Sequence, residues 1–207
     1  MNKIEATVLT RVLCDSGSII EPGILYLVGE TVDNEISVIR RGASLWKAGR
    51  VSLIALVDGR TYKGYPEYTH WLQLLRKHGV PEDGVLKIPV SSNQDFNTLI
   101  EAQVVIAHMK ELRIGTLVIS ASPFHQLIKF MMFVRVAMGV YPQLKIYNAV
   151  GETMDWNKEV RYSQRTQRLT RKELISNELN KILMYQENGD ICSFKEIEHY
   201  FEWRDSQ

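Results

Sequence analysis

Short apolar runs alternate with amphipathic helical patterns through most of this chain, and this alternation constrains its fold more than any other feature. The runs predict strands over 24–28, 51–57, 85–90, 116–120 and 145–150, and the patterns between them predict helices over 37–48, 66–78, 98–112 and 123–138. Neighbouring parallel strands need crossover connections, which are usually helices. The alternation therefore predicts an α/β fold, doubly wound around a mainly parallel sheet of about five strands.

The C-terminal quarter of the chain has a different texture. Residues 152–171 are polar, which indicates an excursion over the surface, and helical periodicity returns over 170–185 and 193–201. We expect one domain over residues 1–207, with a core at about 22–150 and a helical extension at about 151–207. Within the core, Pro89 confines the third run to a sheet edge or to a strand end, because proline cannot donate to a strand ladder.

Composition excludes several classes of protein. Lys and Arg number 25 against 24 Asp and Glu, so the near-neutral charge predicts no general grip on nucleic acid. Cys14 and Cys192 show no metal-ligand or disulfide spacing, which favours a reducing cytoplasm. Residues 1–20 have acidic side chains and no long apolar core, unlike a signal peptide. The chain also lacks an apolar run of membrane-spanning length, so we expect no membrane partner.

Polar side chains gather where the third expected strand gives way to a helix. Asn97, Thr98 and Glu101 stand at that helix start. Capping alone explains Thr98 and Glu101, since this spacing is that of a capping box. The functional interpretation is that free backbone N–H groups and the helix dipole bind an anionic ligand group there, with the Asn97 amide as a further contact.

A second polar group follows the fourth expected strand. Ser120 ends that strand, Ser122 is the expected N-cap, Pro123 the expected first helical residue, and His125 lies in the first turn. The positive end of a helix disfavours imidazolium, so we expect a neutral His125 that donates or accepts a hydrogen bond. The ordinary alternative is a histidine satisfied by neighbouring backbone groups.

The first two strands also end in polar pairs, Gly29 with Glu30 and Asp58 with Gly59. Turn formation explains an Asp-Gly pair by itself, but a carboxylate there could instead bind a ribose hydroxyl, a metal or a catalytic water. The glycine-rich dinucleotide and P-loop motifs, the serine-hydrolase elbow and the HExxH metal motif do not occur.

These residues together resemble the DUF218 domain family, the group of YdcF-like, SanA-like and ElyC-like bacterial proteins. The resemblance covers about residues 22–150. It is carried by Gly29, by residues 43–49, 58–59 and 79–81, by Asn97, Thr98, Glu101 and Ala102, and by residues 122–125. It implies a Rossmann-like three-layer sandwich with a pocket at the strand ends, but no settled reaction. The chain departs from the family in two ways: Ile128 replaces an arginine common in members, with Lys129 beside it, and the membrane anchor of some members is missing.

From these features we expect a protein that binds a small anionic or nucleotide-like metabolite at the strand ends. The expected ligand-binding residues are Gly29, Glu30, Asp58, Gly59, Asn97, Thr98, Ser120 and Ser122. If the protein hydrolyses its ligand or transfers a group from it, Glu101 or His125 would be the general base.

The competing hypothesis is a non-catalytic module that binds a ligand or another protein. The sequence names no cofactor, although a nucleotide or an adenosyl-type ligand is possible. It contains no metal motif. A homodimer is a further possibility.

Overall fold

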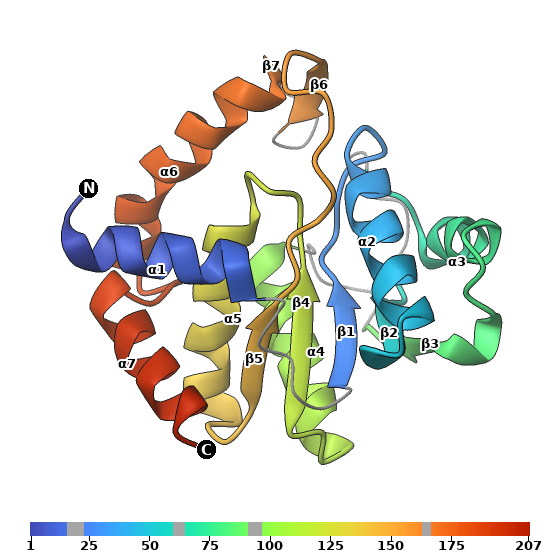
Figure 1. The fold of residues 1–207 in the computed structure, drawn as a ribbon, viewed down its shortest axis with the longest axis horizontal. Helices are drawn as coiled ribbons and strands as arrows, with labels where there is room; N and C mark the ends of the chain where they lie inside the picture. The colour runs from blue at the N-terminus through green and yellow to red at the C-terminus, as the bar shows by residue number, and fades with distance from the viewer. Residues whose placement is uncertain (16–22, 60–64, 91–96, 163–166) are drawn as a thin grey trace.

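Five parallel strands form the central sheet of the computed structural model, which describes residues 1–15, 23–59, 65–90, 97–162 and 167–207 (Figure 1). The strands are β1 (Gly23–Leu27), β2 (Val51–Val57), β3 (Val85–Ile88), β4 (Thr116–Ser120) and β5 (Lys145–Asn148). Their order across the sheet is β3-β2-β1-β4-β5. The predicted α/β, Rossmann-like sandwich is confirmed, and β3, which Pro89 follows, lies at an edge.

The strand order has a functional consequence. Along the chain the sheet grows from β1 through β2 to β3, and then returns to the other side of β1 with β4 and β5. Leu27 at the end of β1 lies opposite Ser120 at the end of β4. Ligands of open α/β sheets bind outside the carboxyl ends of the strands where the order reverses, so the β1 and β4 ends form the expected position for a site.

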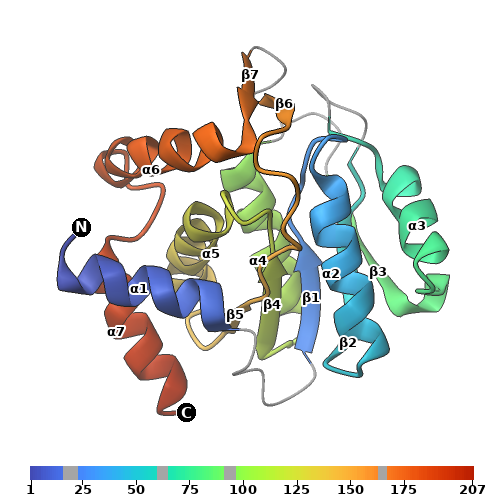
Figure 2. The ribbon, with the colours of Figure 1, turned by 45° about the horizontal axis from the view of Figure 1, so that its top comes forward.

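Helices cover both faces of the sheet (Figure 2). One face carries α2 (Glu35–Lys47) and α3 (Tyr68–Lys77), packed on side chains such as Leu25, Leu27 and Ile54. The other carries α4 (Thr98–Glu111) and α5 (Gln126–Val140), which pack on Tyr26 and Ile119. The face that a residue of β1 or β4 points to alternates along the strand, as parallel buried strands require.

Two helices that are distant in sequence lie side by side near the β5 edge. They are α1 (Lys3–Cys14) and α7 (Phe194–Asp205), and both pack on α5. Helix α7 was predicted, although the structure extends it beyond residue 201. Helix α1 was not predicted. Its only buried residues are Val8 and Val12, and its capping box pairs Asn2 with Glu5.

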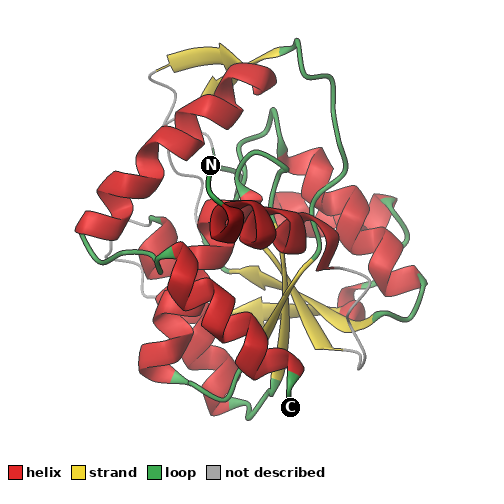
Figure 3. Cartoon of the chain, turned by 60° about the vertical axis from the view of Figure 1, so that its left-hand side comes forward, coloured by secondary structure: helices red, strands yellow, loops and turns green. Residues whose placement is uncertain are grey.

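The polar stretch after β5 is more ordered than the sequence indicated. It contains a hairpin of β6 (Glu159–Tyr162) and β7 (Gln167–Thr170), which leads directly into α6 (Arg171–Glu187) (Figure 3). Neither strand of this hairpin was predicted, although most described side chains of residues 152–161 are exposed or half-buried, as expected for a segment that runs over the surface. Val160 and Leu174 are buried with Phe124, so the hairpin and α6 are joined to the β4–α5 connection.

Two predicted helix starts are also corrected. Helix α3 begins at Tyr68, so Pro66 precedes it, and α5 begins at Gln126 rather than at Pro123. Residues 122–125 form a turn in which the Ser122 carbonyl accepts from the N–H groups of His125 and Gln126. Within the described part of the chain, no helix combines the length and apolar character needed to cross a membrane.

Candidate functional site

The connections that follow β1 and β4 are bonded directly to each other. The Val28 N–H donates to the Ser120 carbonyl at 2.9 Å, which extends the pairing of the two strands. Beyond this point the Glu30 carboxylate, almost fully buried, accepts from the Ser122 N–H at 2.8 Å. The carboxylate also contacts His125 Nδ1, with its two oxygens at 3.2 and 3.3 Å. The structure thus brings together three residues that the sequence placed on two separate strand ends.

The Glu30 contact defines the state of the His125 ring. An ionised carboxylate can only accept a hydrogen bond, so Nδ1 must carry the proton. In the neutral ring, Nε2 is then the accepting nitrogen. Nε2 lies 3.9 Å from Glu178 Oε1, and Lys181 Nζ donates to the same carboxylate oxygen at 2.9 Å. His125 therefore lies between a carboxylate of the β1–α2 connection and one of α6.

Glu101 does not cap its helix as predicted. Asn97 is the N-cap of α4, and its side chain accepts from the Ile100 N–H at 3.1 Å. The Glu101 side chain points instead toward β1, where Oε1 accepts from the Tyr26 hydroxyl at 2.5 Å and from the Gly29 N–H at 2.7 Å. A methyl group on residue 29 would lie 3.3 Å from this oxygen, so the close approach favours glycine.

The two buried carboxylates differ in proton affinity. Burial alone would raise the pKa of Glu30, but the contacts with His125 and Ser122 outweigh burial and hold that pKa below its usual value. Burial raises the pKa of Glu101, and the lowering effects of Lys129, Tyr26 and Gly29 do not fully offset it. The Glu30 charge raises the pKa of Glu101 further. Carboxyl groups whose pKa values are driven apart in this way are typical of sites that separate acid and base roles.

A lysine connects the starts of α4 and α5. Lys129, in the first turn of α5, is largely buried and donates from Nζ to the Thr98 hydroxyl at the start of α4. Its charge is close enough to Glu101 to lower the pKa of that carboxyl. Lys129 therefore brings a positive charge to the site from α5, although Ile128 stands where DUF218 members often have an arginine. A positive charge at two helix starts favours an anionic group.

An aromatic side chain lies among these acids. Tyr65 Cδ1 would be 3.7 Å from a methyl group on Gly29. Burial raises the pKa of Tyr65, and the charges of Glu30, Glu101 and Glu178 raise it further, so all three carboxylates lie near its hydroxyl. We call Glu30, Glu101, Ser122, His125 and Lys129 the switch-point cluster, with Tyr65 and Glu178 at its border.

The remaining predicted residues lie apart from the cluster or are internal to the fold. Asp58 forms an exposed ion pair with Lys87 at 2.9 Å, and the Gly59 carbonyl accepts from the Tyr68 N–H, so this pair holds the ends of β2, β3 and α3. Ser120 is fully buried, and its hydroxyl has no hydrogen-bond partner among the described residues.

Sequence reasoning missed several residues of the site. Tyr26 reads as an ordinary strand residue and Glu178 as a charged helix residue, and Lys129 was noted only as the neighbour of Ile128. For Glu178 the spacing along α6 offered a signal, because Glu178 lies four residues from both Leu174 and Ile182 and so shares their helix face. In the structure all three side chains are buried. In the described ranges, no three His, Cys, Asp or Glu side chains are grouped so that they could hold a metal.

Comparison with known proteins adds no further guide to the site. The chain matches no protein-family model, no curated protein and no solved structure.

Proposed function

We propose that this protein binds a small anionic or nucleotide-like metabolite at the switch-point cluster and uses His125 as a general base to hydrolyse it or transfer a group from it. The observation that carries the proposal is the buried Glu30–His125 pair at the junction of β1 and β4. The resemblance of this chain to the DUF218 family is part of the same proposal. A bacterial origin is also part of the proposal, as is a cytoplasmic setting, which the two free cysteines favour.

The proposed base is His125 rather than Glu101. A carboxylate at Nδ1 orients a histidine, sets its tautomer and stabilises the imidazolium that forms during proton transfer. Glu30 has the position and the lowered pKa for this role. In the reaction, Nε2 takes a proton from water as the water oxygen bonds to the substrate, and the imidazolium returns the proton to the leaving group. Glu101 Oε1 already accepts two hydrogen bonds.

The preference for an anion rests on Lys129 and the two helix starts. Lys129 Nζ reaches Thr98 at the start of α4 from the first turn of α5. The cluster also contains two carboxylates, so an anion must approach from the Lys129 side, away from Glu30. Burial strengthens such a charge pairing, because the effective dielectric constant is lower than in water.

A titration series tests this function. A panel of nucleotides, sugar phosphates and small carboxylates should give at least one ligand that wild type binds and His125→Ala binds more weakly. The loss should be on the order of 1–3 kcal/mol if the ligand group facing His125 is left buried and unpaired. His199→Ala on α7, whose side chain is exposed, is the control and should bind as wild type does. Equal affinities of the three proteins would contradict the assignment.

The second candidate is a binding module without catalysis. It is favoured by α6, on which Ile175, Leu179 and Leu183 are exposed at successive turns with 39%, 45% and 71% of their surfaces accessible. Turnover assays with every ligand found in the panel separate the two functions. Ligand binding without any product, at all pH values where the protein is folded, would favour the module.

A further inference from the structure

A chain of buried hydrogen bonds joins the switch-point cluster to the C-terminal helix. The Ala121 N–H donates to Gln126 Oε1 at 2.7 Å, and Gln126 Nε2 donates to Asn148 Oδ1 at 2.8 Å. Asn148 donates to Asp15 Oδ2 from its backbone N–H at 2.9 Å and from Nδ2 at 3.1 Å. Asp15 then accepts two bonds from Arg204, at 2.7 and 2.8 Å. Gln126 and Asn148 are fully buried, and Asp15 and Arg204 nearly so.

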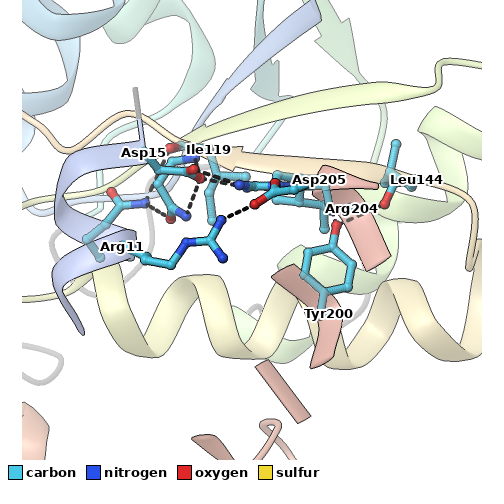
Figure 4. Close-up of polar contacts among 10 residues, drawn as sticks. Arg11, Asp15, Ile119, Leu144, Tyr200, Arg204 and Asp205 are labelled. Carbon is cyan, nitrogen blue, oxygen red and sulfur yellow. Dashed lines mark hydrogen bonds and ion pairs between the residues drawn. The ribbon is translucent and has the colours of Figure 1, made fainter. Parts of the chain in front are cut away.

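The direction of every bond in this chain is determined by its two ends. A backbone N–H can only donate, so the atom of Gln126 that faces Ala121 must be the oxygen. A guanidinium can only donate, so Asp15 must be the acceptor. The two amides between them can then take one orientation each, with Gln126 Nε2 also facing the Ile119 carbonyl at 3.3 Å. Figure 4 shows Arg204 directed at Asp15.

The Gln126 end of the chain acts on the turn that carries the proposed base. Ala121 and Gln126 flank the turn of residues 122–125, and the Gln126 side chain accepts from the Ala121 N–H across this turn. The turn has a second support in the Gly151 N–H, which donates to the Ala121 carbonyl. The Gln126 bond is the one that satisfies the Ala121 N–H, adjacent to the Ser122 N–H that binds Glu30.

We propose that Gln126 and Asn148 are positioning residues, which set the Ser122–His125 turn so that His125 Nδ1 meets Glu30. The role given to His125 rests on the proposed function, but the geometry is a property of the protein without ligand. Neither amide belongs to the switch-point cluster, and each acts through the backbone of the turn.

Nuclear magnetic resonance of ligand-free, full-length protein tests the inference. Imidazole ¹⁵N signals report which ring nitrogen carries the proton, so wild type should show His125 protonated at Nδ1. Gln126→Met keeps the length of the side chain but removes its three hydrogen bonds, and it should yield mixed His125 tautomers. Tyr200→Phe is the matched control. This variant removes the buried hydrogen bonds of the Tyr200 hydroxyl of α7 with Ile146 and Leu144. It should leave the His125 signals unchanged.

Unchanged His125 signals in folded Gln126→Met would overturn the inference, as would equal changes in Tyr200→Phe. If Gln126→Met does not fold, hydrogen exchange of wild type decides. The Ala121 amide should then exchange as slowly as that of Val118 inside β4, and fast exchange would overturn the inference. If no panel compound binds wild type but the tautomer shifts as expected, the proposed function fails and the positioning role stands. If a panel compound binds as proposed and the tautomer does not shift, the positioning role fails and the proposed function stands.

Discussion

Glu30 and Glu101 are buried near each other but have opposite electrostatic surroundings. Glu30 faces His125 and the Ser122 N–H, which favour its ionised form over the effect of burial. Glu101 faces Tyr26 and Gly29, and there burial and the Glu30 charge prevail. Removing the charge of each residue should therefore change stability in opposite directions with pH.

For Glu30→Gln we expect lower stability than wild type at neutral pH, by about 2 kcal/mol, the usual contribution of hydrogen bonds to a charged group. The folded pKa of Glu30 lies below its unfolded value, so its contribution is complete above the unfolded pKa. The contribution is lost as pH falls through the folded pKa. Urea denaturation from pH 3 to pH 8 should show the deficit shrink on acidification, and a deficit that grows would contradict the account.

For Glu101→Gln we expect the opposite trend. The folded pKa of Glu101 is raised, so wild type loses stability as pH rises from the unfolded to the folded pKa. The variant should gain on wild type over that window, because an oxygen in the place of Oε1 can still accept from Tyr26 and Gly29. Glu111→Gln, exposed at the other end of α4, controls for the loss of one negative charge. A variant that loses stability relative to wild type as pH rises would sink this assignment.

At the residue scale the sequence predicted candidate polar residues but not what they contact. The prediction that Glu101 and Thr98 form a capping box followed from local spacing, and local spacing cannot show that Tyr26, many residues earlier, offers a hydroxyl at 2.5 Å. Glu30 and His125 could be proposed separately. Their contact depends on the adjacency of β1 and β4, which the order of elements along the chain does not determine.

At the scale of elements, one buried arginine at the start of α6 bonds to the β1–α2 connection of the sheet domain. Arg171 donates to Asn34 Oδ1 at 2.9 Å, to the Asp155 carbonyl at 2.9 Å and to the Asp33 carbonyl at 2.6 Å. Asp33 and Asn34 belong to the connection that also carries Glu30. Arg171 thus connects α6, which carries Glu178 near His125, to the same connection as Glu30.

We therefore expect Arg171→Leu to loosen the hairpin and α6 while the sheet stays folded. Each unpaired acceptor left behind costs about 1–3 kcal/mol if it stays buried, so local opening should become easier. Hydrogen exchange should speed up over residues 171–187 and remain slow in β1 and β4. Lys172→Ala, at the exposed neighbouring position, is the control. Equal protection of α6 in Arg171→Leu and wild type would show that other contacts hold the helix.

Element prediction succeeded for the strands and crossover helices of the sheet and for α6 and α7, and it failed for α1 and the hairpin, which bury few side chains. The five strands and four crossover helices carry many apolar side chains, because each contacts the core. Helix α1 buries only Val8 and Val12, and among the residues with described side chains the hairpin buries Val160. Such elements are stabilised by capping, pairing and contacts with distant residues, which single-segment periodicity does not reveal.

At the scale of the whole molecule, the two ends of the chain close the β5 edge together. Arg204 of α7 forms a buried ion pair with Asp15 at the end of α1 and also donates to the Ile146 carbonyl of β5 at 2.9 Å. Arg11 of α1 pairs in turn with Asp205 (Figure 4). Helices α6 and α7 of the extension thus share buried apolar contacts with the core, through side chains such as Ile182 and Phe201.

Arg204→Met should destabilise the protein by about 3–5 kcal/mol, because it leaves the Asp15 carboxylate buried and unpaired. The double variant Arg204→Met with Asp15→Leu should recover much of that loss, since no unpaired charge remains. Guanidinium denaturation of the wild type, both single variants and the double variant measures the coupling. Additive losses in the double variant would show that the two residues do not depend on each other.

The central claim is that the switch-point cluster binds a small anionic metabolite. Native mass spectrometry of protein purified without added ligand tests it most directly, on wild type, His125→Ala and the His199→Ala control. We predict that wild type and the control retain the same small anionic molecule and that His125→Ala retains less of it. A retained molecule at equal levels in all three proteins would contradict the account, as would wild type that carries none and binds no compound of the metabolite panel.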